Sequence, residues 1–519
     1  MFQLLLAVVS YKNNEGRMSR GSHDTSKSGA IPSDSEYNYK ACLKKENKEK
    51  LFKAAMMGDN DTIYDLFMRR QCLTSQDEDG NTALHLAAER GNNRTCRLLV
   101  VLAAPEKLWK VRNNKGKTAE QVAHGEDVKD DLHGLGHIPK KKGDVQSLVN
   151  DMLCDNKTVW DEHEQVGLCL DGGGTRGFIH AQVLLHLEQK LEGQLMDYVD
   201  WIGGTSCGGI FGLMTATGSS LNFFRHALFR KTRNIFCGNK NTFPKHNSIG
   251  METVMRKQFG DSRMSAIRNK KVFVTVSDSR KTPISMILFR NYRPRIPDAM
   301  MEKYQFLDPD RILIWKAARC TSAAPYYFHS FHGYTDGGIV ANNPTMALMT
   351  DFMLVNKLEK YFGLTEEIKK EASKKRIGVM ISLGTGQSPV AQTEGIDVNM
   401  SKVMAKNPWK IAQNIMAAFK SAKNMMQVLI KECTSSNGQP VRYAREWCHS
   451  LEIPYFRFTP ELSTDVPLDT TNSDVLMNML WETEIFVHGE AASDLDRLAR
   501  LLRLKKQPDN CTTANLKDE

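Results

Sequence analysis

The stretch "VDWIGGTSCGGIFG", residues 199–212, places a serine at the centre of a Gly-Thr-Ser-Cys-Gly pentapeptide. Its hydrophobic pattern predicts a buried strand over residues 198–202 and the opening of an apolar helix over residues 210–214. A strand, a sharp turn and a helix form a nucleophile elbow, whose tight turn leaves no space for a Cβ on either side of the serine. Gly204 and Gly208 meet that requirement, so Ser206 is a candidate nucleophile. The alternative is a glycine-rich turn with an inert serine.

A second glycine-rich turn lies within "VGLCLDGGGTRGFIHAQVLLHLEQKL", residues 166–191. The pattern predicts a strand over residues 166–170, the turn, and then an amphipathic helix. Further strand-like runs occur at residues 272–276, 286–289 and 378–383. Strands that alternate with helices indicate an α/β fold with a mainly parallel sheet, in which ligands bind at the carboxyl ends of the strands. Both glycine turns follow strands, so we expect both at that edge.

The spacing of this second turn, G-x-G-x-x-G, also matches the dinucleotide-binding fingerprint, so a nucleotide-binding enzyme is the rival prediction. Such a site needs an acidic residue at the end of a second strand about 20 residues on, whereas Glu188 and Glu192 fall in or just after the helical pattern. The same turn can instead form an oxyanion hole from backbone N–H groups. If Ser206 is the nucleophile, this turn supplies the donors, and Arg176 adds positive charge beside them.

The base for the serine is less obvious. In "GYTDGGIVANNP", residues 333–344, Asp336 precedes two glycines on a tight turn where a carboxylate can be aimed. Six histidines follow Ser206 in the chain and could complete a Ser/His/Asp triad by order, but none lies in a comparable turn. His329 and His332 lie close to Asp336 in sequence and keep a triad open.

The N-terminal region contains an internal repeat. "LFKAAMMGDNDTIYDLF" from residue 51 aligns with "LHLAAERGNNRTCRLLV" from residue 84, an offset of 33 residues. The segment "DGNTALH", residues 79–85, resembles the start of an ankyrin repeat, and a similar turn occurs at residues 114–118. We therefore predict two to three ankyrin repeats. Because such arrays need about three repeats to bury a continuous core, we expect them to pack on the catalytic domain or on a second copy of the chain.

The amino-acid composition limits the class of protein that the chain can be. The 519 residues are 41% hydrophobic and 25% charged, which is typical of a globular protein of two to four domains. A net charge of +10 suits an anionic membrane surface as well as nucleic acid and decides neither. Eleven cysteines without zinc-ligand spacing predict reduced thiols in the cytosol. The apolar start "MFQLLLAVVS" is shorter than the roughly 20 residues of a membrane span and is expected to be a weak anchor or a disordered start.

Three motifs in one order carry a resemblance: "DGGGTRG" at 171–177, "GTSCG" at 204–208 and "DGG" at 336–338, with "NNP" behind it. Together they resemble the patatin-like phospholipases. With the repeats in front and the segments "WKAARCTSAAPYYF", "YFRFTPELSTD" and "LMNMLWETEIFV" beyond, the chain is most similar to the group VI calcium-independent phospholipases A2 over roughly residues 46–505. It has fewer ankyrin repeats than the long members of that group. The resemblance implies a patatin-like α/β fold.

The resemblance also implies a reaction. The enzyme would hydrolyse the sn-2 ester of glycerophospholipids to a free fatty acid and a lysophospholipid through an acyl-enzyme, with Ser206 as nucleophile and Asp336 as base, and no histidine. Arg176 would contact the substrate. The oxyanion hole would comprise Gly172, Gly173, Gly174 and Cys207. No cofactor and no metal site are expected, since "DEDG" at residues 77–80 lacks the ligand spacing of a calcium loop. The third alternative is a non-catalytic ankyrin scaffold with a dead hydrolase fold.

The predicted organisation follows from these segments: a disordered segment 1–45, ankyrin repeats 46–126, a polar linker 127–165, a catalytic domain with a C-terminal extension 166–505, and a tail 506–519. We expect a cytoplasmic protein that associates peripherally with membranes carrying its phospholipid substrate, with no nucleic-acid partner. A homo-oligomer is a further expectation.

Two amphipathic stretches have alternative interpretations. "FFRHALFRKTRNIF", residues 223–236, combines aromatic and basic residues and is either a membrane-interfacial segment or a helix with core-facing aromatics and a solvated basic face. "NPWKIAQNIMAAFKSAKNMMQVLIKE", residues 407–432, is either a calmodulin-binding helix or a helix packed into its own domain.

Overall fold

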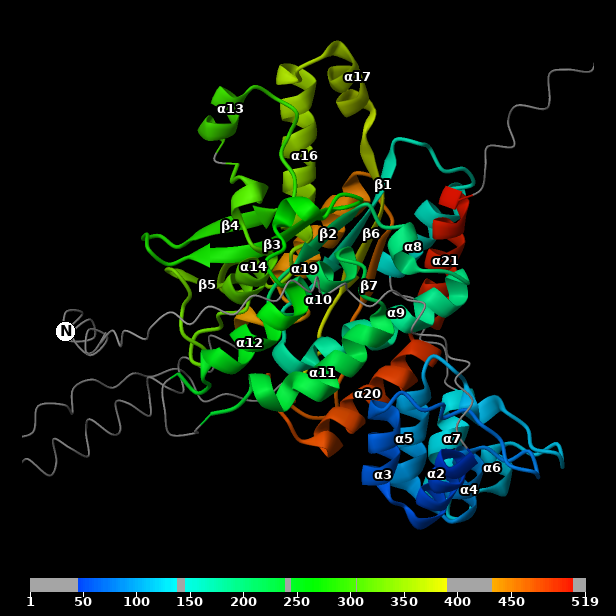
Figure 1. Cartoon of the computed structure of the whole chain (residues 1–519). Helices are drawn as coiled ribbons and strands as arrows, with labels where there is room; N and C mark the ends of the chain where they lie inside the picture. The colour runs from blue at the N-terminus through cyan, green and yellow to red at the C-terminus, as the bar shows by residue number, and fades with distance from the viewer. Residues whose placement is uncertain (1–44, 138–144, 239–243, 305, 390–431, 507–519) are drawn as a thin grey trace, which may run out of the picture. The chain divides into compact units, whose positions relative to one another are not determined.

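The computed structural model describes residues 45–137, 145–238, 244–304, 306–389 and 432–506 (Figure 1). The apolar start of the chain, the C-terminal tail and all but the last residue of the amphipathic stretch 407–432 lie outside these ranges, so the predictions made for them stay predictions. The described residues form a set of N-terminal helix pairs and an α/β domain.

Three helix pairs make up the N-terminal part. Gly58 and Gly91 each end the first helix of a pair with φ of 73° and 70°, a conformation that favours glycine. Successive turns are joined by a hydrogen bond from Asn113 Nδ2 to Asn81 Oδ1 at 2.8 Å. This repeated arrangement agrees with the ankyrin prediction. The helices are α2 (Lys45–Met57), α3 (Asn60–Met68), α4 (Ala83–Glu89), α5 (Asn93–Ala103), α6 (Ala119–Val122) and α7 (Glu126–Gly136).

The segment 127–165 differs from the predicted linker, because it contains most of α7 and the whole of α8 (Val145–Asn156). Helix α7 is the second helix of the third pair and buries a helical stripe of Val128, Leu132 and Leu135. Helix α8 is tied to the α/β domain, since Asn150 Oδ1 accepts a hydrogen bond from the Tyr455 N–H at 2.8 Å. The high polar content of this segment reflects two amphipathic helices with exposed faces.

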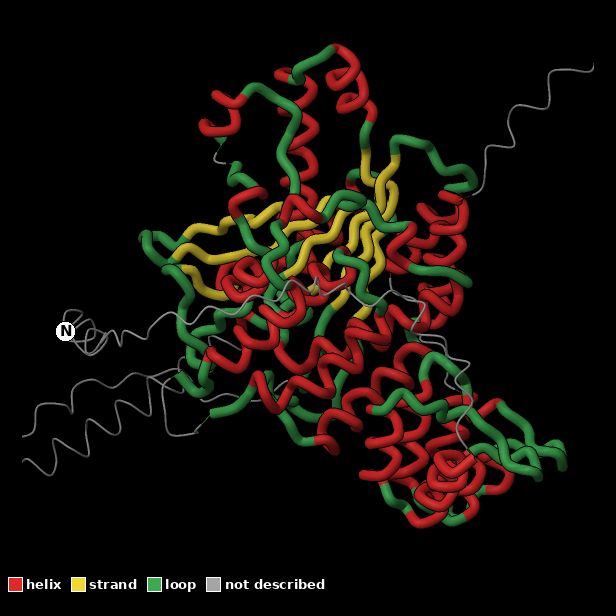
Figure 2. Tube along the Cα trace, viewed as in Figure 1, coloured by secondary structure: helices red, strands yellow, loops and turns green. Residues whose placement is uncertain are grey.

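A mainly parallel sheet forms the centre of the α/β domain (Figure 2). Its order is β4-β3-β2-β1-β6-β7, with β5 also paired to β3; β4 and β5 run antiparallel to β3 and the other pairs are parallel. The predicted α/β class is confirmed. The strands are β1 (Glu164–Leu170), β2 (Trp201–Gly204), β3 (Lys271–Asp278), β4 (Ser285–Arg290), β5 (Tyr334–Asp336), β6 (Arg376–Leu383) and β7 (Tyr455–Phe458).

Helices cover both faces of the sheet (Figure 1). Along β1, Leu168 and Leu170 belong to one apolar core, whereas Cys169 between them belongs to a second core on the opposite face. This double burial explains the near-continuous apolar strands. The helices are α9 (Phe178–Leu191), α10 (Cys207–Ala216), α11 (Leu221–Ile235), α12 (Ser248–Phe259), α13 (Asp298–Lys303), α14 (Ile314–Thr321), α15 (Gly338–Ala341), α16 (Thr345–Phe362), α17 (Glu366–Lys374), α19 (Gln439–Ser450), α20 (Ser473–His488) and α21 (Ala492–Lys506).

Two expectations drawn from composition can be compared with the described residues. The nine cysteines among them are all free thiols, as expected for reduced cysteines. None of the helices in the described ranges combines the length and the apolar character that crossing a bilayer requires.

The N-terminal helix pairs pack directly on the α/β domain. Helix α5 lies along α20, and its Val101 carbonyl accepts a hydrogen bond from Gln182 Nε2 of α9 at 3.2 Å. The Phe67 ring of α3 stacks on His226 of α11 with centroids 4.2 Å apart. Apolar residues of both parts form one continuous core. The repeats therefore pack on the α/β domain, the first of the two surfaces expected for them, and contact with a second copy stays a prediction.

We predict that residues 46–137, expressed alone, fold poorly. Isolation exposes the face of α5 that α20 covers and the Trp109 ring, which is only 5% exposed and lies against His488. Each large apolar side chain that returns to water costs about 1.5–3 kcal/mol. Far-UV circular dichroism during a thermal melt measures the outcome, with residues 46–506 as the control. A cooperative melt of the fragment with native helical signal would contradict the prediction.

Candidate active site

Ser206 lies at the turn between β2 and α10 with φ 54° and ψ −122°. Positive φ is uncommon for a residue with a side chain, and it is the strained geometry of a nucleophile elbow. A Cβ on Gly204 would come within 2.6 Å of the Gly209 Cα, and one on Gly208 within 2.3 Å of the Leu170 carbonyl oxygen. Both glycines are therefore required by packing, as the pentapeptide predicts.

The sheet brings Asp336 to this turn. Strands β2 and β5 pair with successive parts of the same edge of β3, since β4 occupies its other edge. Gly204 pairs with Val274 and Asp336 pairs with Val276. With a rise of about 3.3 Å per strand residue, Asp336 lies just beyond the end of β2, where Ser206 emerges. Residues 130 apart in sequence are thus placed side by side.

The two side chains are in direct contact. Ser206 Oγ donates a hydrogen bond to Asp336 Oδ2 at 2.6 Å, and the Gly338 N–H donates to Asp336 Oδ1 at 2.7 Å. This fixes the carboxylate with one oxygen on the serine. The direct bond leaves no place for a histidine between the two side chains. His329 and His332 are both exposed residues. The geometry is that of a Ser/Asp pair.

Burial changes the pKa of the Asp336 carboxylate. Asp336 is only 5% exposed, and desolvation raises its pKa to about 6, although the hydrogen bonds from Ser206 and Gly338 oppose the shift. At pH 7 the group is mostly ionised, so it can accept a proton. Its pKa is also closer to neutrality than that of an exposed aspartate, so it can return the proton to a leaving group.

Three of the four predicted oxyanion donors line the same cavity as the serine: Gly173, Gly174 and Cys207. Helix α10 begins at Cys207, so the N–H of that residue has no acceptor within the helix and is available to an anion. The prediction that the Gly172 N–H is a free donor of the oxyanion hole was wrong. Its N–H donates to the Asn342 carbonyl oxygen at 3.2 Å and is already engaged.

Arg176 also differs from its predicted role as a substrate contact. It is only 6% exposed and is not among the residues that line the cavity. Its guanidinium lies near Cys207, where burial raises the pKa of the thiol and the nearby positive charge only partly opposes that shift. The short helical turn that carries it, Gly174–Gly177, points the side chain into the protein. Arg176 therefore lies behind the residues predicted to form the oxyanion hole and outside the lining of the cavity.

Sequence reasoning missed a buried ion pair at the glycine turn of residues 171–177. Arg457 of β7 contacts Asp171 through Nη2–Oδ2 at 2.6 Å and Nη1–Oδ1 at 3.2 Å. Asn343 Nδ2 donates to Asp171 Oδ1 at 2.8 Å, and Arg457 Nη1 donates to Ser382 Oγ at 2.8 Å. The side chains of Asp171 and Arg457 are 0% and 5% exposed. The one available signal was an arginine within the apolar run "YFRF".

A narrow apolar cavity of about 130 Å³ opens beside Ser206 and Asp336. Its apolar lining includes Leu228, Ile235, Phe236, Met251, Met255 and Phe328. Helix α11 supplies Leu228 and Ile235, and Phe236 directly follows it, while Phe224 and Phe229 of the helix are buried in the core. For those two rings the core-facing interpretation of residues 223–236 holds. Membrane contact by the basic face, with Arg230 and Arg233 exposed, stays a prediction.

The nucleotide-binding alternative lacks its acidic residue. Strand β2, which follows the glycine turn and α9, runs into Thr205 and Ser206 and ends without a carboxylate. Glu188 lies within α9 and accepts a hydrogen bond from the Leu195 N–H at 2.9 Å, and Glu192 caps the same helix. Neither is placed to bind a ribose at the carboxyl end of a strand.

Comparison with known proteins finds two matching families. The family model of patatin-like phospholipases matches residues 168–349, and that of ankyrin repeats, in three copies, matches residues 51–129. An "85/88 kDa calcium-independent phospholipase A2" from Rattus norvegicus is 33% identical over 343 residues, 64% of this chain and 40% of that protein. An "Intracellular phospholipase A2" from Caenorhabditis elegans is 30% identical over 340 residues, 65% of this chain and 29% of that protein.

A relative whose name describes it as inactive also matches. A "Probable inactive patatin-like protein 9" from Arabidopsis thaliana is 28% identical over 296 residues, 49% of this chain and 70% of that protein. The chain spans less than half the length of the rat and nematode proteins.

Proposed function

The chain carries a patatin-like phospholipase domain behind ankyrin repeats, and from this we propose that it is a calcium-independent phospholipase A2 that cleaves the sn-2 ester of glycerophospholipids. The observation that carries the proposal is the 2.6 Å hydrogen bond between Ser206 and Asp336 at the wall of an apolar cavity. An inactive scaffold would have no need to keep this pair and its strained turn. The names of the rat and nematode relatives support the same activity.

The first half of the reaction forms an acyl-enzyme. Ser206 Oγ attacks the ester carbonyl carbon while its proton passes to Asp336 Oδ2. The negative oxygen of the tetrahedral intermediate is stabilised by the N–H groups of Gly173, Gly174 and Cys207, each contributing about 3 kcal/mol. When the intermediate collapses, the bond to the glycerol oxygen breaks, and Asp336 returns the proton to the lysophospholipid that leaves.

The second half releases the fatty acid. Asp336, ionised again, takes a proton from a water molecule as the water oxygen attacks the acyl carbon. The second tetrahedral intermediate uses the same N–H donors. Its collapse breaks the bond to Ser206 Oγ, which recovers its proton from Asp336. One carboxylate thus serves as base and acid in both halves.

The shape of the site supports a lipid substrate. The apolar cavity beside Ser206 suits the part of an acyl chain nearest the ester. A second cavity of about 600 Å³ shares Gly338, Asn342 and Cys433 with it and offers space for the rest of the lipid. Because the substrate lies in a bilayer, the proposal includes peripheral membrane association from the cytoplasmic side, and the exposed basic face of α11 suits an anionic surface.

We predict an acid limb in kcat/KM with an apparent pKa of about 6. The base must be ionised, and burial raises the pKa of Asp336 to about 6, so activity falls about tenfold per pH unit below that value and is retained above it. A soluble short-chain ester should be the substrate, so that vesicle charge does not change with pH, and circular dichroism should verify that the protein stays folded. An acid limb near pH 4 would contradict a buried base.

We predict that activity survives excess EGTA, because no step of the proposed reaction uses calcium. The assay is hydrolysis of phosphatidylcholine carrying different labels on its two acyl chains, with Ser206→Ala as the blank. Release of the sn-2 fatty acid alone, at equal rates in EGTA and in calcium, is expected. Activity that is lost in EGTA and restored by calcium would overturn the prediction, and release of the sn-1 label would overturn the regiospecificity.

A fluorophosphonate should label Ser206, whereas an inert scaffold would remain unlabelled.

A further inference from the structure

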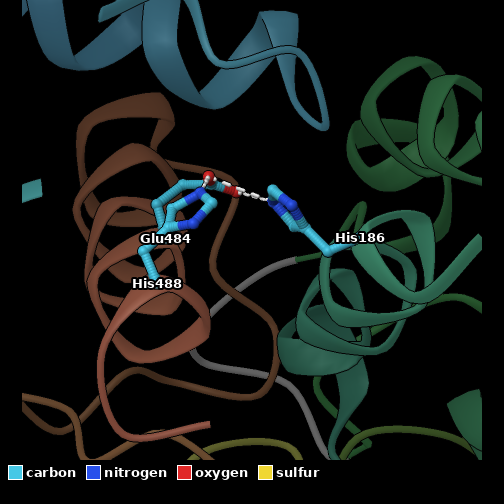
Figure 3. Close-up of side chains that lie close together, drawn as sticks. All are labelled: His186, Glu484 and His488. Carbon is cyan, nitrogen blue, oxygen red and sulfur yellow. Dashed lines mark hydrogen bonds and ion pairs between the residues drawn. The ribbon is translucent and has the colours of Figure 1, made fainter. Parts of the chain in front are cut away.

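A second cluster of chemically reactive side chains lies away from the serine, between α9 and α20 (Figure 3). Glu484 and His488 are one helical turn apart on α20, so they share a face of that helix. His186 of α9 points at them from the facing helix (Figure 3). Their side chains are 0%, 11% and 3% exposed, respectively. The proposed hydrolysis uses none of them.

The three side chains converge on one point. His186 Nε2 lies 2.9 Å from Glu484 Oε1 and 3.1 Å from Oε2, and His488 Nε2 lies 3.4 Å from Oε2. One donor atom from each residue lies within 4.8 Å of the other two. Tetrahedral ligands at zinc-ligand distances of about 2.0–2.1 Å are about 3.3 Å apart. Two of the three separations are therefore already close to those of a metal site, and a small rotation of one imidazole brings the third into range.

The surroundings also suit a bound cation. His488 Nε2 is buried and makes no hydrogen bond within the described residues beyond its long 3.4 Å ion-pair contact with Glu484 Oε2, so a weakly engaged nitrogen is directed at the cluster. Gln182 Nε2 donates to Glu484 Oε1 at 2.5 Å, the kind of hydrogen bond that orients a ligating carboxylate. The Trp109 ring packs against His488 with centroids 4.7 Å apart and shields the cluster from the ankyrin side.

We propose that His186, Glu484 and His488 form a site for a divalent transition-metal ion, of which Zn²⁺ is the best match. Two imidazoles and one carboxylate are the ligands that Zn²⁺ accepts, whereas Ca²⁺ and Mg²⁺ prefer oxygen alone. Binding displaces the proton that now lies in the His186–Glu484 hydrogen bond, and water completes the coordination. The ion is structural: it joins α9 to α20 directly beneath the ankyrin helix α5, which packs along α20.

The test uses the full-length protein stripped with a chelating resin. Zn²⁺ is titrated in against a chromophoric zinc indicator, and the bound metal is counted by elemental analysis. We expect one ion per chain and a higher melting temperature with Zn²⁺. Co²⁺ in place of Zn²⁺ should give the visible absorption of tetrahedral nitrogen and oxygen ligands without thiolate charge transfer. This spectrum distinguishes the cluster from the free cysteines.

Three variants and one control locate the ion. His186→Ala, His488→Ala and Glu484→Gln should each weaken binding by at least about tenfold, a loss that even an outer partner of a metal ligand can cause. His226→Ala is the control, because it removes another histidine at the contact between the repeats and the catalytic domain and should bind like the wild type. Glu484→Gln keeps the size of the side chain and guards against loss of folding.

Two results would overturn the proposal. One is a wild-type protein that binds no Zn²⁺ at micromolar concentrations, which would leave the cluster as a buried ion pair. The other is tight binding that all three variants retain, which would place the ion elsewhere. Both readouts are independent of catalysis, so they stand whether or not the protein is a phospholipase.

Discussion

Asp336→Asn should lower kcat by a factor of about 10⁴ or more, to the residual level of Ser206→Ala. The amide can occupy the position of the carboxylate, but it cannot accept the serine proton or return it to the leaving group. In a triad the acid only orients a histidine, whereas here the carboxylate itself touches Ser206 Oγ. The measurement is single-turnover and steady-state hydrolysis of a phospholipid by purified, folded variants.

The stability of the variant separates lost chemistry from lost folding. Burial raises the pKa of Asp336, so the folded state binds its proton more tightly than the unfolded state and the ionised form destabilises the fold at neutral pH. Asp336→Asn should therefore melt at or above the wild-type temperature at pH 7. His329→Ala and His332→Ala are the matched controls and should keep most of kcat. A folded histidine variant as inactive as Ser206→Ala would replace the dyad with a triad.

Arg457→Met should lower the free energy of unfolding by about 3–5 kcal/mol. The substitution places an unbranched apolar side chain where the arginine stem lies in β7. It leaves the Asp171 carboxylate, which is fully buried, without its cation. The pair contributes less than this loss, because most of the cost is that of an uncompensated buried charge. Guanidinium-induced unfolding, followed by circular dichroism, gives the difference.

Two controls sharpen this second prediction. The double variant Asp171→Asn with Arg457→Met removes both charges and should recover part of the loss. Arg69→Met breaks an exposed pair, with side chains 66% and 47% exposed, and should cost no more than about 0.5 kcal/mol. If Arg457→Met behaved like Arg69→Met, the buried pair could not be what holds the glycine turn.

Local patterns predicted the elements that depend on neighbouring residues. The elbow was predictable because Gly204 and Gly208 are required by a turn of five residues, and the strand, turn and helix around it have distinct periodicities. The Ser206–Asp336 contact is different, since it depends on β2 and β5 sharing one edge of β3. No local pattern carries that register, and only the family resemblance paired the two residues.

Other features required the tertiary structure. The engaged N–H of Gly172 depends on Asn342, which is 170 residues away, and the burial of Arg176 depends on what packs around its turn. The helices in the segment predicted as a linker were obscured by their polar faces. Short strands such as β7, with four residues, offer too few positions to establish a period, so Arg457 could not be assigned to a buried site.

The continuous core between the repeats and the catalytic domain has a consequence for inherited or engineered variation. A damaging substitution in α5, far along the chain from the serine, would leave the rate of each intact molecule unchanged and reduce the number of intact molecules in the cell. Assays normalised to active-site titre would record no defect, whereas assays normalised to total expression would record a large one. A defect in abundance would then be mistaken for a defect in regulation.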